Sequence, residues 1–325
     1  MRQPGLGLLF AAAAFAQDVV SVRAGMIHHI EGDVYLNAAK LKEERISMSM
    51  PTLRSGSTLR TERGRAEVLL SPGVIFRVAT DSTVKMVGDS LTDTRLELIG
   101  GSAMLEVMDS LKGNVTTIAY RDATIVPRRP GIYRVGGEMP ELMCYDGAVD
   151  LTRDGKTVTL KRGRAVMLHD WKLSRKFDPR RGDSLVQWTA VRSEKLAIAS
   201  RGSVASLVDM RRGWRTSTWR WDPGYGMFSY IPASGYYCGY FGSCFYAPQA
   251  YYSTFVAPPP RWDSSQTASG GGRGYDSGGG YATVSQRGYE APSVSSAPAA
   301  SAPAPAARSS ESASGRGGEG GGRSQ

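Results

Sequence analysis

The sequence contains few of the residues from which metal sites and disulfide frameworks are built. Its 325 residues include three cysteines and three histidines. A disulfide-held miniprotein and a four-thiolate zinc site both need more cysteines than this. Two of the histidines, His28 and His29, are neighbours, and neighbouring residues of a strand point to opposite faces, so they do not chelate a metal easily. We therefore expect no metal site and no cofactor.

The chain also lacks the short motifs that carry catalysis or nucleotide binding. Its body has no Gly-x-Ser-x-Gly elbow, no phosphate loop ending in Gly-Lys-Ser or Gly-Lys-Thr, and no Gly-x-Gly-x-x-Gly after a strand. The carboxylates that could be paired are Glu62, Glu67, Asp93, Glu97 and Glu106. Several of them alternate with apolar residues and are expected to face water, where nothing raises a carboxylate pKa. We expect that the protein is not an enzyme.

No hydrophobic run reaches the roughly 18 apolar residues of a spanning helix. The N-terminus instead has Arg2, a short apolar run over residues 6–16 and the small-residue ending Ala14-Phe15-Ala16. This pattern predicts a signal peptide over residues 1–16, and a short buried helix is the alternative. Gln17 stands where a lipoprotein would have cysteine. We expect a periplasmic or secreted protein without a transmembrane span.

The other end of the chain and the positive charge give two further expectations. Residues 263–325 are dominated by Gly, Ser, Ala and Pro, which bury too little apolar area to fold, so they should form a disordered tail. The net charge is +10, and residues 153–220 hold 17 basic and 6 acidic residues. That stretch is either a solvated face or a site for an anionic polymer. An exported protein is not expected to meet nucleic acid.

Residues 17–170 have the pattern of short strands. Between Gly32 and His169, glycines recur mostly eight to twelve residues apart. Apolar residues alternate with polar ones between these turns, as in Ala66, Val68 and Leu70. Such alternation puts one face on a core and the other in water. The fold class is therefore all-β, a stack or sandwich of short antiparallel strands, with a solenoid-like arrangement as a further option.

A basic helical segment is expected over residues 171–212. Gly182-Asp183-Ser184 offers an N-cap, and Gly202 offers a stop, so the helix should run from Asp183 to Ser200. The residues expected to pack this helix against the β body are Leu185, Trp188 and Val191. Arg192 and Lys195 are expected to face outward.

Residues 213–262 are dense in aromatic residues without a clear period, so we expect an irregular segment. Tyr and Trp combine apolar area with a polar tip, which suits interfaces and sugar stacking. The candidate interaction residues are Trp214, Trp219, Trp221, Tyr225, Tyr230, Arg211 and Arg212. The alternative is that these rings cover an edge of the β domain or form a Gly-rich cap.

Cys238 and Cys244 are expected to form a disulfide in a hairpin, with Cys144 a buried free thiol.

The strand region resembles a FecR domain over roughly residues 30 to 110, with weaker similarity to about residue 168. The residues that carry the resemblance are Gly56-Ser-Thr-Leu-Arg-Thr-Glu62, Arg63-Gly-Arg-Ala-Glu-Val-Leu-Leu70, Pro72-Gly73, Arg77, Ser82, Leu96, Leu98, Gly101 and Glu106-Val107. The helix pattern Asp183-x-Leu-x-x-Trp188-x-x-x-Arg192 resembles one in secreted bacterial proteins that carry such domains. The family's namesakes are inner-membrane regulators whose periplasmic domain senses a transporter and whose cytoplasmic end controls a sigma factor.

This chain has an apparent signal peptide where such a regulator has its cytoplasmic domain and spanning helix. The resemblance therefore implies an extracytoplasmic β-rich interaction domain without direct control of a sigma factor. The function we expect is that of a non-catalytic, exported FecR-like protein that binds another envelope protein or senses it. The alternative is a binding module for anionic glycan or cell-wall material.

Overall fold

The computed structural model describes residues 24–43, 51–109, 113–169 and 174–257, which all belong to one structural unit. The predicted signal peptide over residues 1–16 and the predicted tail over residues 263–325 lie outside the described residues. Within these four ranges, no helix has both the length and the apolar character needed to cross a membrane.

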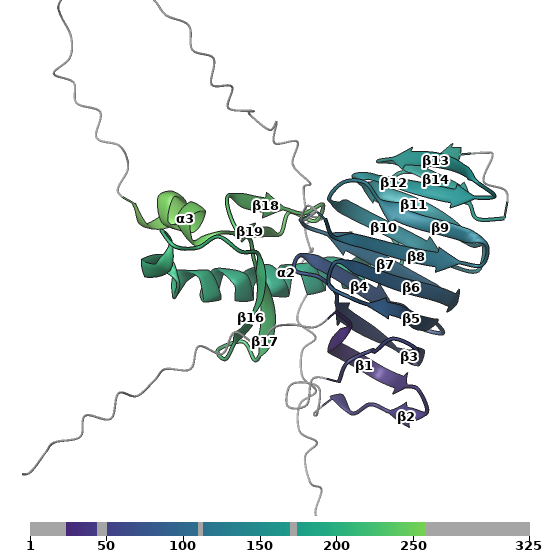
Figure 1. The fold of residues 1–325 in the computed structure, drawn as a ribbon, viewed down its shortest axis with the longest axis horizontal. Helices are drawn as coiled ribbons and strands as arrows, with labels where there is room; N and C mark the ends of the chain where they lie inside the picture. The colour runs from purple at the N-terminus through teal and green to yellow at the C-terminus, as the bar shows by residue number, and fades with distance from the viewer. Residues whose placement is uncertain (1–23, 44–50, 110–112, 170–173, 258–325) are drawn as a thin grey trace, which may run out of the picture. The chain divides into compact units, whose positions relative to one another are not determined.

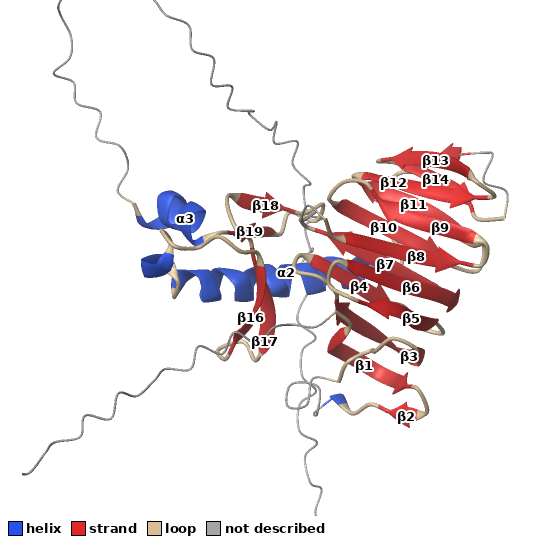
Figure 2. Ribbon diagram, viewed as in Figure 1, coloured by secondary structure: helices blue, strands red, loops and turns tan. Residues whose placement is uncertain are grey.

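Fifteen strands of the described chain form one large sheet (Figures 1 and 2). Its strands are β1 (Met26–Leu36), β2 (Ala39–Lys40), β3 (Thr58–Leu69), β4 (Val74–Val78), β5 (Thr83–Asp89), β6 (Asp93–Gly100), β7 (Ser102–Val107), β8 (Val115–Tyr120), β9 (Ala123–Pro127), β10 (Gly131–Gly136), β11 (Glu141–Asp146), β12 (Ala148–Arg153), β13 (Lys156–Lys161), β14 (Arg164–Met167) and β15 (Ser174–Lys176). The all-β prediction is confirmed.

The C-terminal part of the described chain adds helices and two hairpins. The elements are α2 (Ser184–Ala205), a 3-10 turn η1 (Val208–Met210), β16 (Thr218–Asp222), β17 (Met227–Ile231), β18 (Tyr236–Cys238), β19 (Cys244–Tyr246), α3 (Pro248–Tyr251) and a π-helical turn η2 (Tyr252–Val256). β16 pairs with β17, and β18 pairs with β19. The segment that we expected to be irregular is therefore largely ordered as hairpins.

The order of the strands shows how the large sheet folds over. It runs β13-β12-β9-β8-β6-β5-β3-β4-β7-β10-β11-β14-β15, with β1 attached to β3. The strands on the two sides of β3 form two arms, one from β5 to β13 and the other from β4 to β15. β3 belongs to both arms, because Thr58–Arg60 pair with β5 and Ala66–Leu69 pair with β4. β6 and β8 pair in parallel, which departs from the antiparallel stack that we predicted. β3 is thus the strand at which one arm becomes the other.

The main core lies between the two arms. Leu96 of β6 and Ile118 of β8 belong to the same buried cluster as Phe76 of β4, Leu105 of β7 and Val135 of β10. These are inward positions of the alternating strands, as the sequence pattern predicted. The hydrophobic contacts across the two arms hold the folded-over sheet together.

The outer face of one arm is buried as well, which the alternation did not predict. Every residue of β4 is buried, including Ile75 and Arg77. Ile75 packs in a second apolar cluster with Leu196 of α2 and Trp219 of β16. α2 and the hairpins therefore cover the surface that strand alternation assigned to water.

Helix α2 begins where the sequence predicted but continues past the predicted stop. The Asp183 carboxylate accepts hydrogen bonds from the backbone N–H groups of Leu185 and Val186, both at 3.1 Å. Gly202 lies inside the helix, which ends at Ala205. A Cβ at Gly202 would lie 2.9 Å from Cε2 of Tyr225, so the glycine allows a close approach rather than a stop.

The buried face of α2 differs from the predicted one. Leu185 and Trp188 are buried, as expected, whereas Val191 is 50% exposed. Arg192, expected to face outward, is 4% exposed, and Lys195 is exposed. Residue 192 is seven positions after Leu185 and so returns to the same helix face, whereas residue 191 does not.

Candidate interaction site

A buried network of charged side chains joins α2 to the sheet. Arg77 of β4 donates to Glu67 of β3 from Nε at 2.8 Å and to Glu106 of β7 from a terminal nitrogen at 2.6 Å. From α2, Arg192 donates to Glu67 at 2.7 Å, and the Ser193 hydroxyl donates to Glu106 at 2.7 Å. Two carboxylates and two guanidiniums thus neutralise each other beneath the helix.

His28 of β1 extends this network to the β16–β17 hairpin. The backbone N–H of Phe228 donates to His28 Nε2 at 2.9 Å, so this nitrogen acts as the acceptor. The proton of the neutral ring is therefore on Nδ1, which donates to Glu67 at 2.9 Å. One carboxylate in this way links β1, β4, α2 and, through His28, the hairpin.

The charges in the network determine the ionisation of Glu67. Burial by itself raises the pKa of this carboxyl, but the charges of Arg192 and Arg77 and the hydrogen bond from His28 outweigh it. The pKa of Glu67 is therefore held well below its usual range. A carboxylate this enclosed stabilises the fold and is not presented to a substrate.

The sequence-based placement of two carboxylates and one arginine was wrong. Glu67 and Glu106, expected on water-facing positions, are 0% and 1% exposed, and Arg192 is buried against Glu67. The reason is the layer formed by α2, which converts the outer face of β3, β4 and β7 into an interior. Polar alternation indicates that side chains share a face, but the sequence pattern does not say what covers that face.

Two of the predicted interaction residues lie in the core and not on the surface. Trp219 and Tyr230 are 2% and 0% exposed, and their rings meet edge to face at 5.7 Å. The indole N–H of Trp219 donates to the carbonyl of Ser71 at 3.2 Å, and the Tyr230 hydroxyl donates to Asp109 at 3.0 Å. Burial raises the pKa of the Tyr230 hydroxyl. These rings pack the hairpin onto the sheet, as the alternative of a covering layer proposed.

The other predicted interaction residues are less deeply buried. Trp214 is half-buried and donates to the carbonyl of Pro232 at 2.8 Å. Trp221 is half-buried, whereas Tyr225 and Arg212 are exposed. The Arg211 guanidinium lies 4.0 Å from the centre of the Tyr252 ring, which belongs to the π-helical turn. The structure does not bring all of these residues together at one place.

A cluster of half-buried and exposed side chains, most of them aromatic, lies further along the chain than we predicted. We call it the aromatic surface, and its residues are Tyr236, Tyr246, Tyr251, Tyr252, Phe255 and Val256. Tyr246 is central, because its ring centre lies 5.8 Å from that of Tyr236 and 5.3 Å from that of Phe255. Tyr236 and Phe255 are 65% and 53% exposed. Arg211 borders this surface through its contact with Tyr252.

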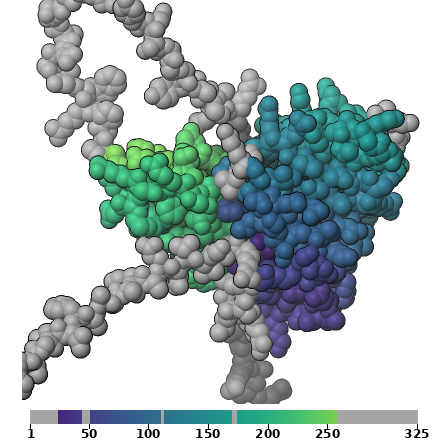
Figure 3. Space-filling view, viewed as in Figure 1, coloured from purple at the N-terminus to yellow at the C-terminus, as the bar shows by residue number. Residues whose placement is uncertain are grey.

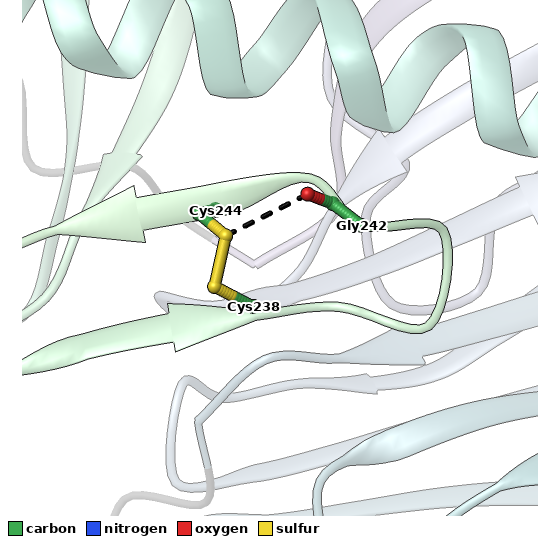
Figure 4. The surroundings of a disulfide bond; sticks show 3 residues. All are labelled: Cys238, Gly242 and Cys244. Carbon is green, nitrogen blue, oxygen red and sulfur yellow. Dashed lines mark hydrogen bonds between the residues drawn. A yellow bond between two sulfur atoms is a disulfide. The ribbon is translucent and has the colours of Figure 1, made fainter. Parts of the chain in front are cut away.

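A disulfide holds the hairpin from which the aromatic surface begins. Cys238 of β18 and Cys244 of β19 are joined, with their Cα atoms 4.0 Å apart (Figure 4). This is the pairing that the sequence suggested, and Cys144 is a buried free thiol. Burial raises the pKa of the Cys144 thiol to about 12, so it is protonated at neutral pH. In the space-filling view, the hairpins and α3 belong to the green lobe beside the sheet (Figure 3).

A sequence signal existed for the burial of Trp219 and Tyr230. The stretch Asp222-Pro-Gly-Tyr-Gly226 is a turn sequence between two aromatic strands. In the hairpin that it closes, Trp219 is paired with Tyr230 and Trp221 with Phe228. Cross-strand pairs of this kind form one face, and a face of large rings is usually buried.

Comparisons with known proteins give little further information. No protein family model matches the chain, and no curated protein matches it. Two crystal structures of a "putative anti-sigma factor" from Parabacteroides distasonis have a TM-score of 0.34 each, at 14% and 15% identity. The matches cover 41% and 40% of this chain, and 64% and 62% of the neighbours, which is less than two thirds of either. Similarity at this level supports no conclusion about function.

Proposed function

We propose that this protein is a non-catalytic, FecR-like module that acts in the periplasm or outside the cell and binds another envelope protein. The observation that carries the proposal is the aromatic surface around Tyr246, with Arg211 at its border. Tyr, Phe and Arg are enriched at the centres of protein interfaces, where their large side chains supply most of the binding free energy. Tyr236, Phe255 and Val256 are at least half exposed, and large apolar side chains gathered in this way on a surface often mark an interaction site.

The arrangement of the rings favours binding because it is ordered in advance. Tyr246 contacts Tyr236, Tyr251 and Phe255, so each ring restricts the rotamers of its neighbours. The disulfide between Cys238 and Cys244 restrains the strands that carry two of these rings. Side chains that are already ordered lose less entropy on binding.

Two features support the proposed compartment. The apparent signal peptide over residues 1–16 directs export, and the disulfide is of a kind that persists in oxidising environments. The family resemblance supports a role in interaction or sensing. Control of a sigma factor is not part of the proposal, because the resemblance covers the β domain alone.

Site-directed photocrosslinking in the native host tests the proposed surface. A benzophenone amino acid at Phe255, on the aromatic surface, should give one discrete adduct with an envelope protein on illumination. The same amino acid at Val87, which is 44% exposed on β5, is the matched control and should give none. Adding Tyr236→Ala should reduce the Phe255 adduct strongly while the melting temperature stays unchanged. Equal labelling from positions 255 and 87, or no adduct from position 255, would contradict the proposal.

A further inference from the structure

A second surface, separate from the aromatic surface, is a groove of about 470 Å³ lined by positive charge. We call it the basic groove, and its lining residues are Arg128, Arg129, Gly147, Ala148, Thr159, Lys161 and Arg162. Arg128 and Arg129 follow β9, Lys161 ends β13, and Arg162 comes next in the turn to β14. The sheet thus brings cations from two distant parts of the chain to one depression.

Carboxylates neutralise two of these four cations. Asp150 binds Nε of Arg128, and its other oxygen accepts a hydrogen bond from the Thr159 hydroxyl at 2.6 Å. Asp146 lies 3.7 Å from a terminal nitrogen of Arg162. Four cations against two carboxylates leave two positive charges in excess at the groove.

The excess charge is carried by residues without an acidic partner. In the described part of the chain, neither Arg129 nor Lys161 has a carboxylate within 4.0 Å, and both are exposed. Asp150 contacts Nε of Arg128, and among the described residues the two terminal nitrogens of that guanidinium have no hydrogen-bond partner. The repulsion between the positive side chains of the groove is relieved when a ligand brings negative charge into it.

The lining residues also restrict the class of ligand. The ring of Tyr240 lies 5.5 Å from the Arg162 guanidinium, but no aromatic ring is among the described lining residues, and single-stranded nucleic acid is generally held by stacking successive bases on several rings. It offers only the small apolar side chain of Ala148, which is a poor anchor for a protein interface. What it does offer is guanidinium groups, whose planar donors match carboxylate and phosphate oxygens.

We propose that the basic groove binds an anionic glycan through the carboxylate or phosphate groups that recur along its chain. Two unpaired positive charges match two such groups, and the open groove admits a polymer that continues beyond it. The hydrogen bond from Thr159 and the ion pair with Arg128 hold Asp150 in place, so this part of the groove is ordered before binding. The proposal is independent of the aromatic surface and adds a second ligand to a protein-binding module.

Binding of defined polyanions to the purified full chain tests the groove. The probes are polygalacturonate as a carboxylated glycan, polyphosphate as a phosphate chain without sugar, and a single-stranded RNA of similar charge. The double variant Arg129→Glu/Lys161→Glu should raise the Kd for polygalacturonate at least about tenfold at moderate ionic strength. Its melting temperature should stay unchanged, because neither side chain has a partner to lose among the described residues.

The matched control is Arg54→Glu/Lys85→Glu, which changes net charge equally at two exposed residues outside the groove. The control should change the Kd less than about twofold, since the groove is intact. Equal weakening by the two double variants would mean attraction by net charge alone and would overturn the proposal. So would tighter groove-dependent binding of the RNA, or of polyphosphate, than of polygalacturonate, or no binding of the glycan. Photocrosslinking from position 255 should be unaffected by the groove variant, which separates this site from the proposed protein surface.

Discussion

Glu67 accepts hydrogen bonds from His28, Arg77 and Arg192, which belong to three separate elements. The side chains of its partners are at most 5% exposed, so neither Glu67 nor the two guanidiniums have water to stabilise their charge if a neighbour is removed. Breaking a buried ion pair is costly mainly for this reason, whatever the pair contributes when intact. The two guanidiniums and two carboxylates are therefore expected to tolerate substitution poorly.

Arg192→Ala should lower the free energy of unfolding by about 3 kcal/mol or more, because it leaves Glu67 with one positive partner fewer in a dry site. Lys195→Ala is the matched control on the same helix, where the side chain is exposed, and should change it by less than about 0.5 kcal/mol. Urea unfolding of both variants measures the difference. Similar small losses from both would show that Arg192 is solvated.

Glu67→Gln should have an effect on stability that depends on pH. The folded-state pKa of Glu67 lies below that of an unfolded glutamate, about 4.3, so its ionisation stabilises the protein above that value. As the pH falls from 4.3 through the folded pKa, the wild type loses this stabilisation and the variant has none to lose. The stability difference should be full at pH 7 and shrink at acid pH, as measured by urea unfolding. A difference that stays constant down to pH 2.5 would contradict the assignment.

At the level of secondary structure, α2 acts as a brace between the sheet and the hairpins. Its first half packs on the sheet through Leu185 and Trp188, and its second half contacts the hairpins, where Ser200 donates to the carbonyl of Tyr230 at 2.7 Å. Trp188 also donates from its indole to Glu31 at 2.7 Å and stacks on His29. Burial and the charge of Arg192 lower the pKa of His29, so this ring is neutral at pH 7.

Trp188→Ala should destabilise the protein by about 3 to 5 kcal/mol, since it removes a buried ring and leaves a cavity beneath the helix. Val191→Ala, three residues along on the exposed face, should cost less than about 0.5 kcal/mol. Thermal unfolding of the two variants distinguishes these faces. If Trp188→Ala keeps full stability but loses the photocrosslinked adduct, the helix is a recognition element and not a brace.

At the scale of the whole molecule, the sequence predicted the class of fold but not its layers. Alternation at Ala66, Val68 and Leu70 correctly assigned strands and their inward face. The same alternation misplaced Glu67. A charged residue on a strand gives the same sequence pattern when it faces water as when an arginine from a distant helix covers it. The disulfide was predictable from local spacing, whereas the aromatic surface required knowledge of which rings the hairpins bury.

The proposed export of the whole chain has a direct test. Cleavage after Ala16 should give a mature protein whose N-terminal sequence begins at Gln17 or within a residue or two of it. Sequencing the protein from osmotic-shock and culture fractions measures this. A protein that keeps Met1 and fractionates with the cytoplasm would remove the compartment from the proposal while leaving both candidate surfaces to be tested.

The buried network also affects when the fold can be completed as the chain is synthesised or exported. Glu67, Arg77 and Glu106 are synthesised long before Arg192, and the hairpin that covers the neighbouring apolar cluster comes later still. Until those residues have left the ribosome or a membrane pore, Arg77 is the one arginine of the network that can pair with Glu67 and Glu106, and the outer face of the strands has one excess negative charge and exposed aliphatic side chains. Incomplete chains in this state are prone to aggregation and proteolysis. Resistance to protease should therefore appear late and abruptly, when the last hairpin closes over the sheet, and not gradually as each strand emerges.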